Sequence, residues 1–331
     1  MSLTVISQTE LRNLGASDLK ISALGLGTWQ FSKGNGFVGG FWPVLEKQEI
    51  EEIIQISLRG GINWFDTAEA YGRGKSEEAL ADVLNGLGDE AKDALIATKW
   101  WPALRTAKSI RQTITQRLQS LKGREIDLYM VHQPFSFSSA TAEMNEMAVL
   151  LKEGKINYVG VSNFNERKMR EAHLALKKHG FPLVSNQMKY SLLDRRIEKN
   201  GVLDAAKELG ITIIAYSPLE QGILTGKFHK KPELIKNITG PRKLASGFKA
   251  SALQRTQPLI DLLDNLAKEY NVSASQIALN WTIHFHGDTI VAIPGATKKH
   301  HAEENVGTLT FKLSDKHLAE IDKVSKEVSV K

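Results

Sequence analysis

Four side chains able to take part in proton transfer lie at or just beyond the ends of apolar, β-rich runs: Asp66, Tyr71, Lys99 and His132. Runs of this kind, closed by a polar residue, are typical of buried strands; they cover residues 62–68, 94–100 and 126–132. A phenol beside an ammonium, a carboxylate and an imidazole makes a tunable acid. The pKa of free tyrosine is about 10, and we expect an adjacent Lys99 cation to lower it.

The other members of this group have roles that follow from their chemistry. Asp66 is expected to keep the lysine charged and aimed, and His132 to orient a substrate oxygen or relay the proton. Alternatively, Asp66 and Lys99 form a purely structural ion pair. The presence of Tyr71 and His132 in the same pattern favours the catalytic interpretation.

The elements that must position these residues follow a regular rhythm. Apolar runs alternate with amphipathic segments at intervals of roughly 30 residues, which is typical of successive βα units with parallel strands. The predicted strands are residues 21–29, 62–68, 94–100, 126–132, 157–163, 183–190, 211–218 and 289–295. Helices are predicted over 46–61, 76–88 and 201–210, with a serine cap at Ser76 and a stop at Gly210. Eight strands predict a (β/α)8 TIM barrel, whose catalytic groups lie at the C-terminal ends of its strands.

Two segments depart from the rhythm. Residues 11–20 are predicted to form an N-terminal β-hairpin, turning over residues 15–18, that plugs the bottom of the barrel. Residues 219–257, after strand 7, read as a long loop of the kind that usually forms a lid or a binding loop, and a helix is predicted from Pro258 to about Tyr270. Because no Pro/Ser-rich linker interrupts the chain, we expect a single domain over residues 1–331, with its core at about 11–322.

Composition excludes several classes of protein. The 331 residues are 42% hydrophobic and 24% charged, and they contain no cysteine, which excludes disulfides, cysteine nucleophiles and thiolate metal sites. The start of the chain is not signal-like and no apolar run reaches the ~20 residues that a bilayer needs, so we expect a cytoplasmic protein without a membrane partner. The net charge of +6 comes from scattered lysines, which favours a solvated surface over nucleic-acid binding. No heptad or exposed apolar stripe in the sequence indicates the oligomeric state.

Other catalytic motifs fail on single residues. The turn after Gly25 and Gly27 has Gln30 where a dinucleotide fingerprint needs a third glycine. Ser162 lacks the following glycine of a nucleophile elbow, because Phe164 occupies that position. The chain also has no Walker-type phosphate loop.

Taken in order, the motifs resemble those of the aldo-keto reductase family from about Leu11 to Asn305. The matching segments are Phe65 to Gly72 with Gly74, Ser76 and Glu77; Ala97 to Lys99; Asp127 to His132; Ser162, Asn163 and Gln187; Tyr216 to Leu219; Gln221 to Lys227; Ile293 to Ala296; and Glu304 with Asn305. The resemblance implies hydride transfer from NADPH to the carbonyl carbon of a small molecule, with Tyr71 as the proton donor and no metal. It also implies that the long loop after strand 7 covers the cofactor and that the protein is a monomer or a weak homo-oligomer.

The resemblance also implies which residues bind. The cofactor contacts it implies are Gly27, Thr28, Trp29, Asp66, Ser162, Asn163, Gln187, Tyr216, Ser217, Pro218, Leu219, Gln221, Gly222, Leu224, Lys227, Pro294, Gly295, Ala296, Thr297, Lys298, His301, Glu304 and Asn305. The substrate pocket is expected to consist of Trp29, Phe31, Tyr71, Trp101 and His132. Trp42 and Trp100 are further candidates, although Trp100 is better explained as core, since alternate strand residues face opposite sides.

Cofactor preference is where the chain departs from better-known members. They carry a basic residue three positions before the Glu-Asn pair, where this chain has His301. Neutral histidine is a weaker phosphate partner than arginine, but Thr297, Lys298 and Lys299 are close in sequence. We expect NADPH to be preferred, with NADH use possible. A metal site at His300, His301 and Glu304 is disfavoured, because two ligands on one helix face do not make a site.

The sequence leaves two alternative functions open. The β-subunits of voltage-gated potassium channels share this fold and cofactor, so a similar chain could act mainly as a redox-responsive regulator with slow turnover. A barrel isomerase with a phosphate site would need no nicotinamide.

Overall fold

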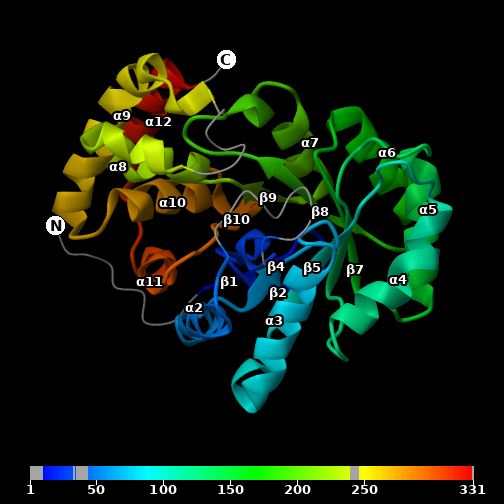
Figure 1. Cartoon of the computed structure of the whole chain (residues 1–331). Helices are drawn as coiled ribbons and strands as arrows, with labels where there is room; N and C mark the ends of the chain where they lie inside the picture. The colour runs from blue at the N-terminus through cyan, green and yellow to red at the C-terminus, as the bar shows by residue number, and fades with distance from the viewer. Residues whose placement is uncertain (1–9, 33, 35–43, 239–245, 330–331) are drawn as a thin grey trace.

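The computed structural model describes residues 10–32, 34, 44–238 and 246–329, and Trp42 therefore lies outside the described residues. Eight parallel strands pair in chain order (Figure 1). They are β3 (Leu26–Gly27), β4 (Trp64–Asp66), β5 (Leu95–Trp100), β6 (Leu128–Val131), β7 (Tyr158–Ser162), β8 (Leu183–Lys189), β9 (Thr212–Tyr216) and β10 (Ile290–Ala292). Parallel bridges from Leu24 to Ala292 and from Gly27 to Gly295 join the two ends of the sheet. The sheet is thereby closed, and the predicted (β/α)8 barrel is confirmed.

The helices surround the barrel and alternate with its strands. They are α2 (Lys47–Arg59), α3 (Lys75–Gly86), α4 (Lys108–Ser120), α5 (Ala140–Lys152), α6 (Glu166–Lys177), α7 (Val202–Leu209), α8 (Lys227–Lys230), α9 (Ala250–Tyr270), α10 (Ala274–His284), α11 (Lys299–Gly307) and α12 (Asp315–Val328). The predicted stop of α7 at Gly210 is confirmed by its φ of 64°. The predicted cap of α3 is wrong: Gly74 occupies the cap position, and the Ser76 hydroxyl instead donates to the Thr28 carbonyl at 2.8 Å.

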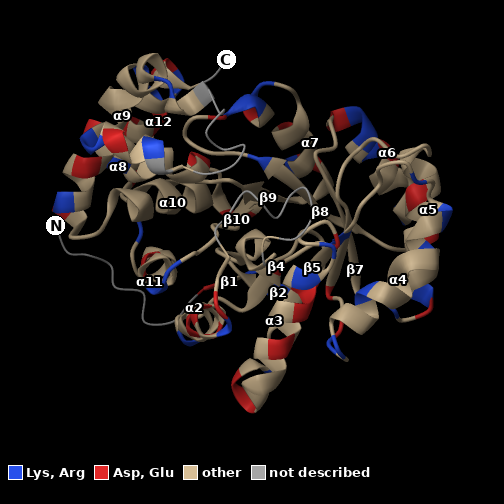
Figure 2. Cartoon of the chain, in the orientation of Figure 1, with Lys and Arg blue, Asp and Glu red and all other residues tan. Residues whose placement is uncertain are grey.

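Two hydrophobic layers hold this arrangement together. Strand residues facing inward, such as Trp64, Met130 and Ile214, fill the barrel, while outward-facing ones pack against the apolar stripes of the helices. All four residues of β6 are buried, as expected for a parallel strand covered on both faces. Figure 2 shows Lys and Arg interspersed with Asp and Glu over the outer helices α3, α4 and α5. No helix within the described ranges combines the length and apolar character needed to cross a membrane.

An N-terminal hairpin plugs the bottom of the barrel, as predicted. Strands β1 (Leu11–Asn13) and β2 (Lys20–Ser22) pair antiparallel, and Leu14 and Ile21 join the interior cluster. Gly15 has a φ of +56°, and a Cβ there would lie 2.3 Å from the Val184 carbonyl oxygen, so only glycine allows this close approach. The single strand expected over 21–29 is wrong, because the chain divides it between β2, β3 and the 3-10 turn η1 (Trp29–Phe31).

The segment after β9 is more ordered than the predicted long loop. It contains the 3-10 turns η4 (Glu220–Thr225), η5 (Pro232–Asn237) and η7 (Ser246–Phe248), as well as α8. Helix α9 begins at Ala250, so the predicted start at Pro258 is wrong. Proline costs an interior helix one hydrogen bond, but Leu253, Leu259 and Ile260 are all buried on this helix. Tertiary packing therefore outweighs the local signal.

Candidate active site

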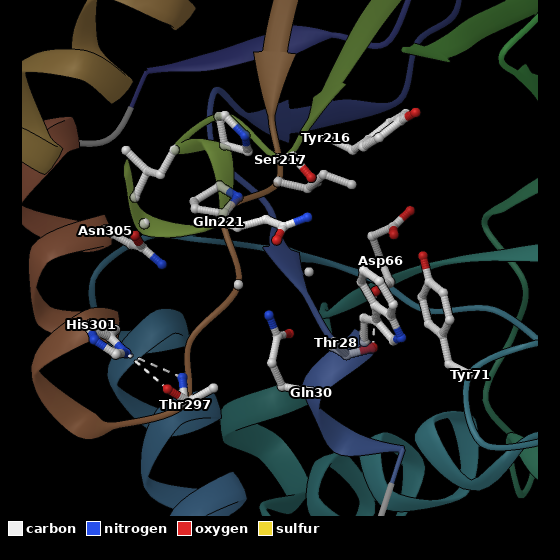
Figure 3. Close-up of a pocket in the computed structure, with 18 of the residues that line it drawn as sticks. Thr28, Gln30, Asp66, Tyr71, Tyr216, Ser217, Gln221, Thr297, His301 and Asn305 are labelled. Atoms are coloured by element: carbon white, nitrogen blue, oxygen red, sulfur yellow. Dashed lines mark hydrogen bonds between the residues drawn. The ribbon is translucent and has the colours of Figure 1, made fainter. Parts of the chain in front are cut away.

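A cavity of about 770 Å³ opens at the C-terminal ends of the strands, where the sequence placed the site (Figure 3). Its volume lies within the roughly 300–1,000 Å³ of typical small-molecule sites. The predicted residues that line it are Gly27, Thr28, Trp29, Asp66, Tyr71, Trp101, His132, Ser162, Asn163, Gln187, Tyr216, Ser217, Pro218, Leu219, Gln221, Gly222, Lys227, Pro294, Gly295, Thr297, Lys298, His301, Glu304 and Asn305. Strands and loops far apart in the sequence thus meet around one space.

Lys99 and Asp66 form a buried ion pair under the cavity floor. The Lys99 ammonium donates to Asp66 Oδ1 at 2.6 Å and to the Thr67 carbonyl at 2.8 Å. Gln187, on β8, donates to the other carboxylate oxygen at 2.8 Å. Burial raises the pKa of Asp66 and lowers the pKa of Lys99, and the attraction between the two charges opposes both shifts. Three strands therefore fix the direction of the lysine side chain.

Tyr71 lies against this pair. The Lys99 ammonium is 5.0 Å from the centre of the tyrosine ring, and the His132 ring meets it edge-on at 5.7 Å. Burial first, and then the negative charge of Asp66, raise the pKa of Tyr71 well above its usual value. The expectation that Lys99 lowers this pKa is therefore wrong for the protein alone, because the burial of the phenol and the negative charge of Asp66 outweigh the lysine. The phenol holds its proton throughout the neutral range.

His132 stands at the end of β6 as a neutral imidazole. Burial and the nearby Lys99 cation lower its pKa well below the usual value. Its Nδ1 atom is buried and makes no hydrogen bond within the described part of the chain. A neutral imidazole carries one N–H donor and one acceptor, so His132 can orient an oxygen in the cavity without adding charge.

Aromatic rings continue from this centre on both sides. Trp29 stacks on Tyr71 with ring centres 6.0 Å apart, and Trp101 meets His132 edge-on at 5.2 Å. Phe135 extends the row, 5.7 Å from Trp101. The assignment of Phe31 to the pocket is wrong, because the 3-10 turn directs it into the hydrophobic core, where it is fully buried. Trp100 is core, as expected.

The middle of the cavity is lined by strand ends with unusual backbone. Tyr216 ends β9, and its hydroxyl donates to Asn163 Oδ1 at 3.0 Å. Asn163 and Ser217 have positive φ values of 61° and 53°, so the backbone turns sharply at the cavity wall after each of these strands. Two predicted cofactor contacts, Leu224 and Ala296, are instead buried in the hydrophobic core and do not line the cavity.

The far end of the cavity is bounded by α11 and the segment before it. The Thr297 amide donates to His301 Nδ1 at 3.3 Å, and Lys298 lies at the same end. Burial first, and then the neighbouring His300, Lys227 and Lys298, lower the pKa of His301 to about 4, so the ring is neutral. Across the described residues, no group of three histidine and acidic side chains is placed to hold a metal ion.

Sequence reasoning missed part of the lining. The additional residues are Gln30, Ala70, Gln133, Thr225, Phe228, Leu234, Ile238, Ser275 and Ile293. Gln133 directly follows His132 at a strand end, so its position was a usable signal. Ser275, on α10, comes to the cavity only through tertiary packing, and nothing in its local sequence marks it.

Comparison with known proteins identifies the family. A model of the aldo/keto reductase family matches residues 23–326. The chain belongs to this family. It is 31% identical over 322 residues to a chloroplastic pyridoxal reductase of Arabidopsis thaliana, covering 93% of this chain and 84% of the relative. An uncharacterized oxidoreductase of Mycobacterium tuberculosis, Rv2298, is 35% identical over 295 residues, covering 89% and 86%.

Solved aldo-keto reductase structures agree with the fold. The glycerol dehydrogenase of Gluconobacter oxydans superposes with a TM-score of 0.81 at 25% identity, covering 98% of each chain. The thermostable aldo-keto reductase Tm1743, solved with the inhibitor epalrestat, gives a TM-score of 0.74 at 27% identity, covering 95% of this chain and 99% of that one. The chain is thus an aldo-keto reductase family oxidoreductase.

Proposed function

We propose that this protein reduces aldehydes and ketones to alcohols with NADPH, with Tyr71 as the proton donor. The observation that carries this proposal is that Asp66, Tyr71 and His132 line one cavity, while Lys99 is buried beneath it against Asp66 and the Tyr71 ring. A donor phenol, a buried cation and a neutral imidazole are the groups needed where negative charge develops on a carbonyl oxygen.

The cavity residues fit a nicotinamide dinucleotide. The Tyr216 ring offers an aromatic face, and the side chains of Asn163 and Gln187 offer the donors and acceptors that a carboxamide needs. At the far end Asn305 Nδ2 is buried and has no hydrogen-bond partner among the described residues, as expected of a group that awaits a ligand. When bound, the nicotinamide supplies the hydride.

The residues of this chain supply orientation and the proton. His132 is placed to hold the substrate oxygen near Tyr71, and the phenol gives up its proton as that oxygen becomes an alkoxide. The Lys99 ammonium, held by Asp66, stabilises the phenolate that remains. Trp29 and Trp101 exclude water from the reacting centre, which strengthens each of these interactions.

A preference for NADPH, with some use of NADH, follows from the far end of the cavity. Thr297 and Lys298 stand beside the start of α11, and Lys227 lines the same space. An ammonium and the backbone N–H groups of a helix start both attract a phosphate. His301 is neutral there and adds little charge, so discrimination against NADH is expected to be moderate.

The aromatic row from Trp29 to Phe135 favours apolar or aromatic carbonyl compounds as substrates. The related pyridoxal reductase is named for an aromatic aldehyde, which is consistent with such a wall. A cytoplasmic location and a monomeric or weakly associated state remain predictions from the sequence.

Steady-state oxidation of NADPH and of NADH with a panel of aromatic and aliphatic aldehydes tests the proposal. Tyr71→Phe keeps the ring and removes the proton, so kcat is expected to fall by about 100- to 10,000-fold, with NADPH binding retained by fluorescence titration. A parent protein that binds NADPH but reduces no aldehyde or ketone would instead favour a cofactor-sensing regulator. A parent that binds no nicotinamide would contradict the proposal altogether.

A further inference from the structure

Buried ion pairs flank the segment that carries Tyr71. Arg117, on α4, donates from Nη1 to Glu77 Oε2 at 2.7 Å, and its Nε lies 3.8 Å from Glu69 Oε2. The side chains of Glu69, Glu77 and Arg117 are at most 8% exposed. We call these three residues and Arg105 the ion-pair cluster. None of the four lines the cavity, and the reaction scheme above gives none of them a role.

The cluster ties the Tyr71 segment to the unit that carries Lys99. Arg105, between β5 and α4, donates both to Glu69 and to the carbonyl of Trp101, the latter at 3.2 Å. Thr98, on β5, donates to Glu77 Oε1 at 2.6 Å. Each carboxylate therefore has two partners from the β5–α4 unit. Glu69 precedes Tyr71 by two residues and Glu77 follows it by six, so the loop is held on both sides of the phenol.

The backbone of this loop needs such support. Gly72, Arg73 and Gly74 have successive positive φ values of 66°, 57° and 89°. A left-handed conformation is unfavourable for a non-glycine residue such as Arg73 and persists only where the surroundings enforce it. Arg117 lies close to this backbone, because a Cβ built on Gly74 would be 3.7 Å from Arg117 Nη2. The cluster thus lies beside the strained turn.

We propose that Arg117, acting through Glu69 and Glu77, is a positioning residue that fixes the distance of the Tyr71 phenol from Lys99 and the substrate oxygen. This inference rests on the proposed role of Tyr71 as the proton donor. A misplacement of about 1 Å can cost a reaction about 100-fold in rate. A buried ion pair contributes little net stability compared with apolar residues of the same shape, so holding geometry is the better explanation of its presence.

The molecule contains a matched control. Arg195 is 2% exposed and donates to Glu198 at 2.8 Å and to Asp322 at 2.6 Å. Like Arg117, it is a buried arginine between two carboxylates, and neither it nor its partners line the cavity. Unlike Glu69 and Glu77, however, Glu198 and Asp322 are far from Tyr71 in the sequence. Arg117→Met and Arg195→Met therefore break equivalent interactions in two different places.

Amide hydrogen exchange on the ligand-free protein tests the inference without any activity. In Arg117→Met, amides of residues 69–76 are expected to exchange at least tenfold faster than in the parent. In Arg195→Met the same amides are expected to keep the parent rate. Unchanged exchange in Arg117→Met, or equal acceleration in both variants, would overturn the positioning role. Should Arg117→Met fail to fold, Glu69→Gln removes one charge from the cluster and is tested in the same way.

Kinetics with NADPH and 4-nitrobenzaldehyde provide the second measurement. Arg117→Met is expected to lower kcat by about 10- to 100-fold, with the NADPH Kd within twofold of the parent. The deuterium isotope effect on kcat should rise, because the chemical step becomes rate-limiting, and Arg117→Lys should recover part of the loss. Arg195→Met should keep the parent kcat per folded molecule. A parent that oxidises no NADPH would contradict the proposed function, and the exchange result would still decide whether Arg117 holds the loop.

Discussion

The two ends of the cavity differ in the burial of their polar residues and in the length of their hydrogen bonds. At the reaction end, Asp66 and Lys99 lie on adjacent strands, are at most 1% exposed and make hydrogen bonds of 2.6–2.8 Å. At the far end, His301 lies on a short helix and meets the Thr297 amide at 3.3 Å. The adjacent Lys299–Glu303 pair has its charges 3.8 Å apart and is more than half exposed. One end is a buried, interlocked network, while the other combines partly buried groups such as His301 with exposed charges such as Lys298.

This difference indicates which property a single substitution will change at each end of the cavity. A charge that loses its partner inside a protein costs several kcal/mol, whereas an exposed pair contributes about 0–1 kcal/mol. Changes at the reaction end are therefore expected to affect stability and rate together. Changes at the far end should alter affinity alone, and each expectation can be tested separately.

The largest effect is expected from Lys99→Met. It leaves Asp66 buried without its cation, which costs about 3–5 kcal/mol of unfolding free energy, and it removes the charge that stabilises the tyrosine phenolate. Urea denaturation and steady-state kinetics should show both losses in the single variant, with kcat reduced at least 100-fold.

The double variant Lys99→Met, Asp66→Asn serves as its control. Replacing the stranded carboxylate by an amide should recover most of the stability and none of the activity. Recovery of activity in the double variant would contradict the role given to the ammonium, and a single variant as stable as the parent would contradict the buried-network description.

The site residues also differ in how well the sequence alone predicted their positions. Asp66, Lys99 and His132 were predictable because apolar strands end at them, and parallel strands bring their C-terminal ends together. Phe31 was misplaced because a 3-10 turn, which follows no strand periodicity, turned its side chain into the core. Local pattern decides which residues end a strand, but not how the chain turns after it.

The electrostatics and the cover of the cavity were harder to predict. The pKa of Tyr71 depends on burial, which no spacing reveals, so the expected direction of its shift was wrong. Helix α9 was predicted too short because proline is typical of the first turn of a helix, whereas packing of Leu253 and Ile260 extends the helix to Ala250. Ser275 and Leu234 line the cavity through long-range packing alone.

A second prediction concerns pH and separates the two ends further. Burial raises the pKa of Glu77, in the ion-pair cluster, to about 7 and that of Glu143, on α5, to about 7 as well. A carboxyl whose pKa is higher in the folded state binds protons there that the unfolded chain has released. Its stabilisation is complete below the unfolded pKa of about 4.5 and is lost as pH rises through 7. Each group should therefore lower the unfolding free energy by about 3 kcal/mol between pH 4.5 and 8.

Urea denaturation at several pH values checks this sign. Glu77→Gln and Glu143→Gln should each flatten part of the decline, since the amide cannot lose a proton. His301 has the opposite sign, because folding lowers its pKa from 6.5 to about 4, so the unfolded chain binds its proton more tightly. His301→Gln should therefore remove a gain in stability between about pH 4 and 6.5 and leave the slope above pH 7 unchanged. A stability profile that neither glutamate substitution changes would contradict the assignment of buried carboxyls that favour the protonated form.

The smallest effect is expected at the far end, from His301→Arg. A guanidinium is charged at all pH values in use and can donate two parallel hydrogen bonds to a phosphate, which a neutral imidazole cannot do. The KM for NADPH is therefore expected to fall about tenfold, equivalent to roughly 1.4 kcal/mol, while the KM for NADH and kcat with either cofactor stay within twofold. His300→Arg is the matched control, because it places the same charge one residue away on a side chain that does not line the cavity. If both variants lower the KM for NADPH equally, long-range attraction rather than a direct contact is responsible. If His301→Arg lowers kcat as strongly as it changes KM, the far end is coupled to the reaction end, and the two regions are less independent than their construction indicates.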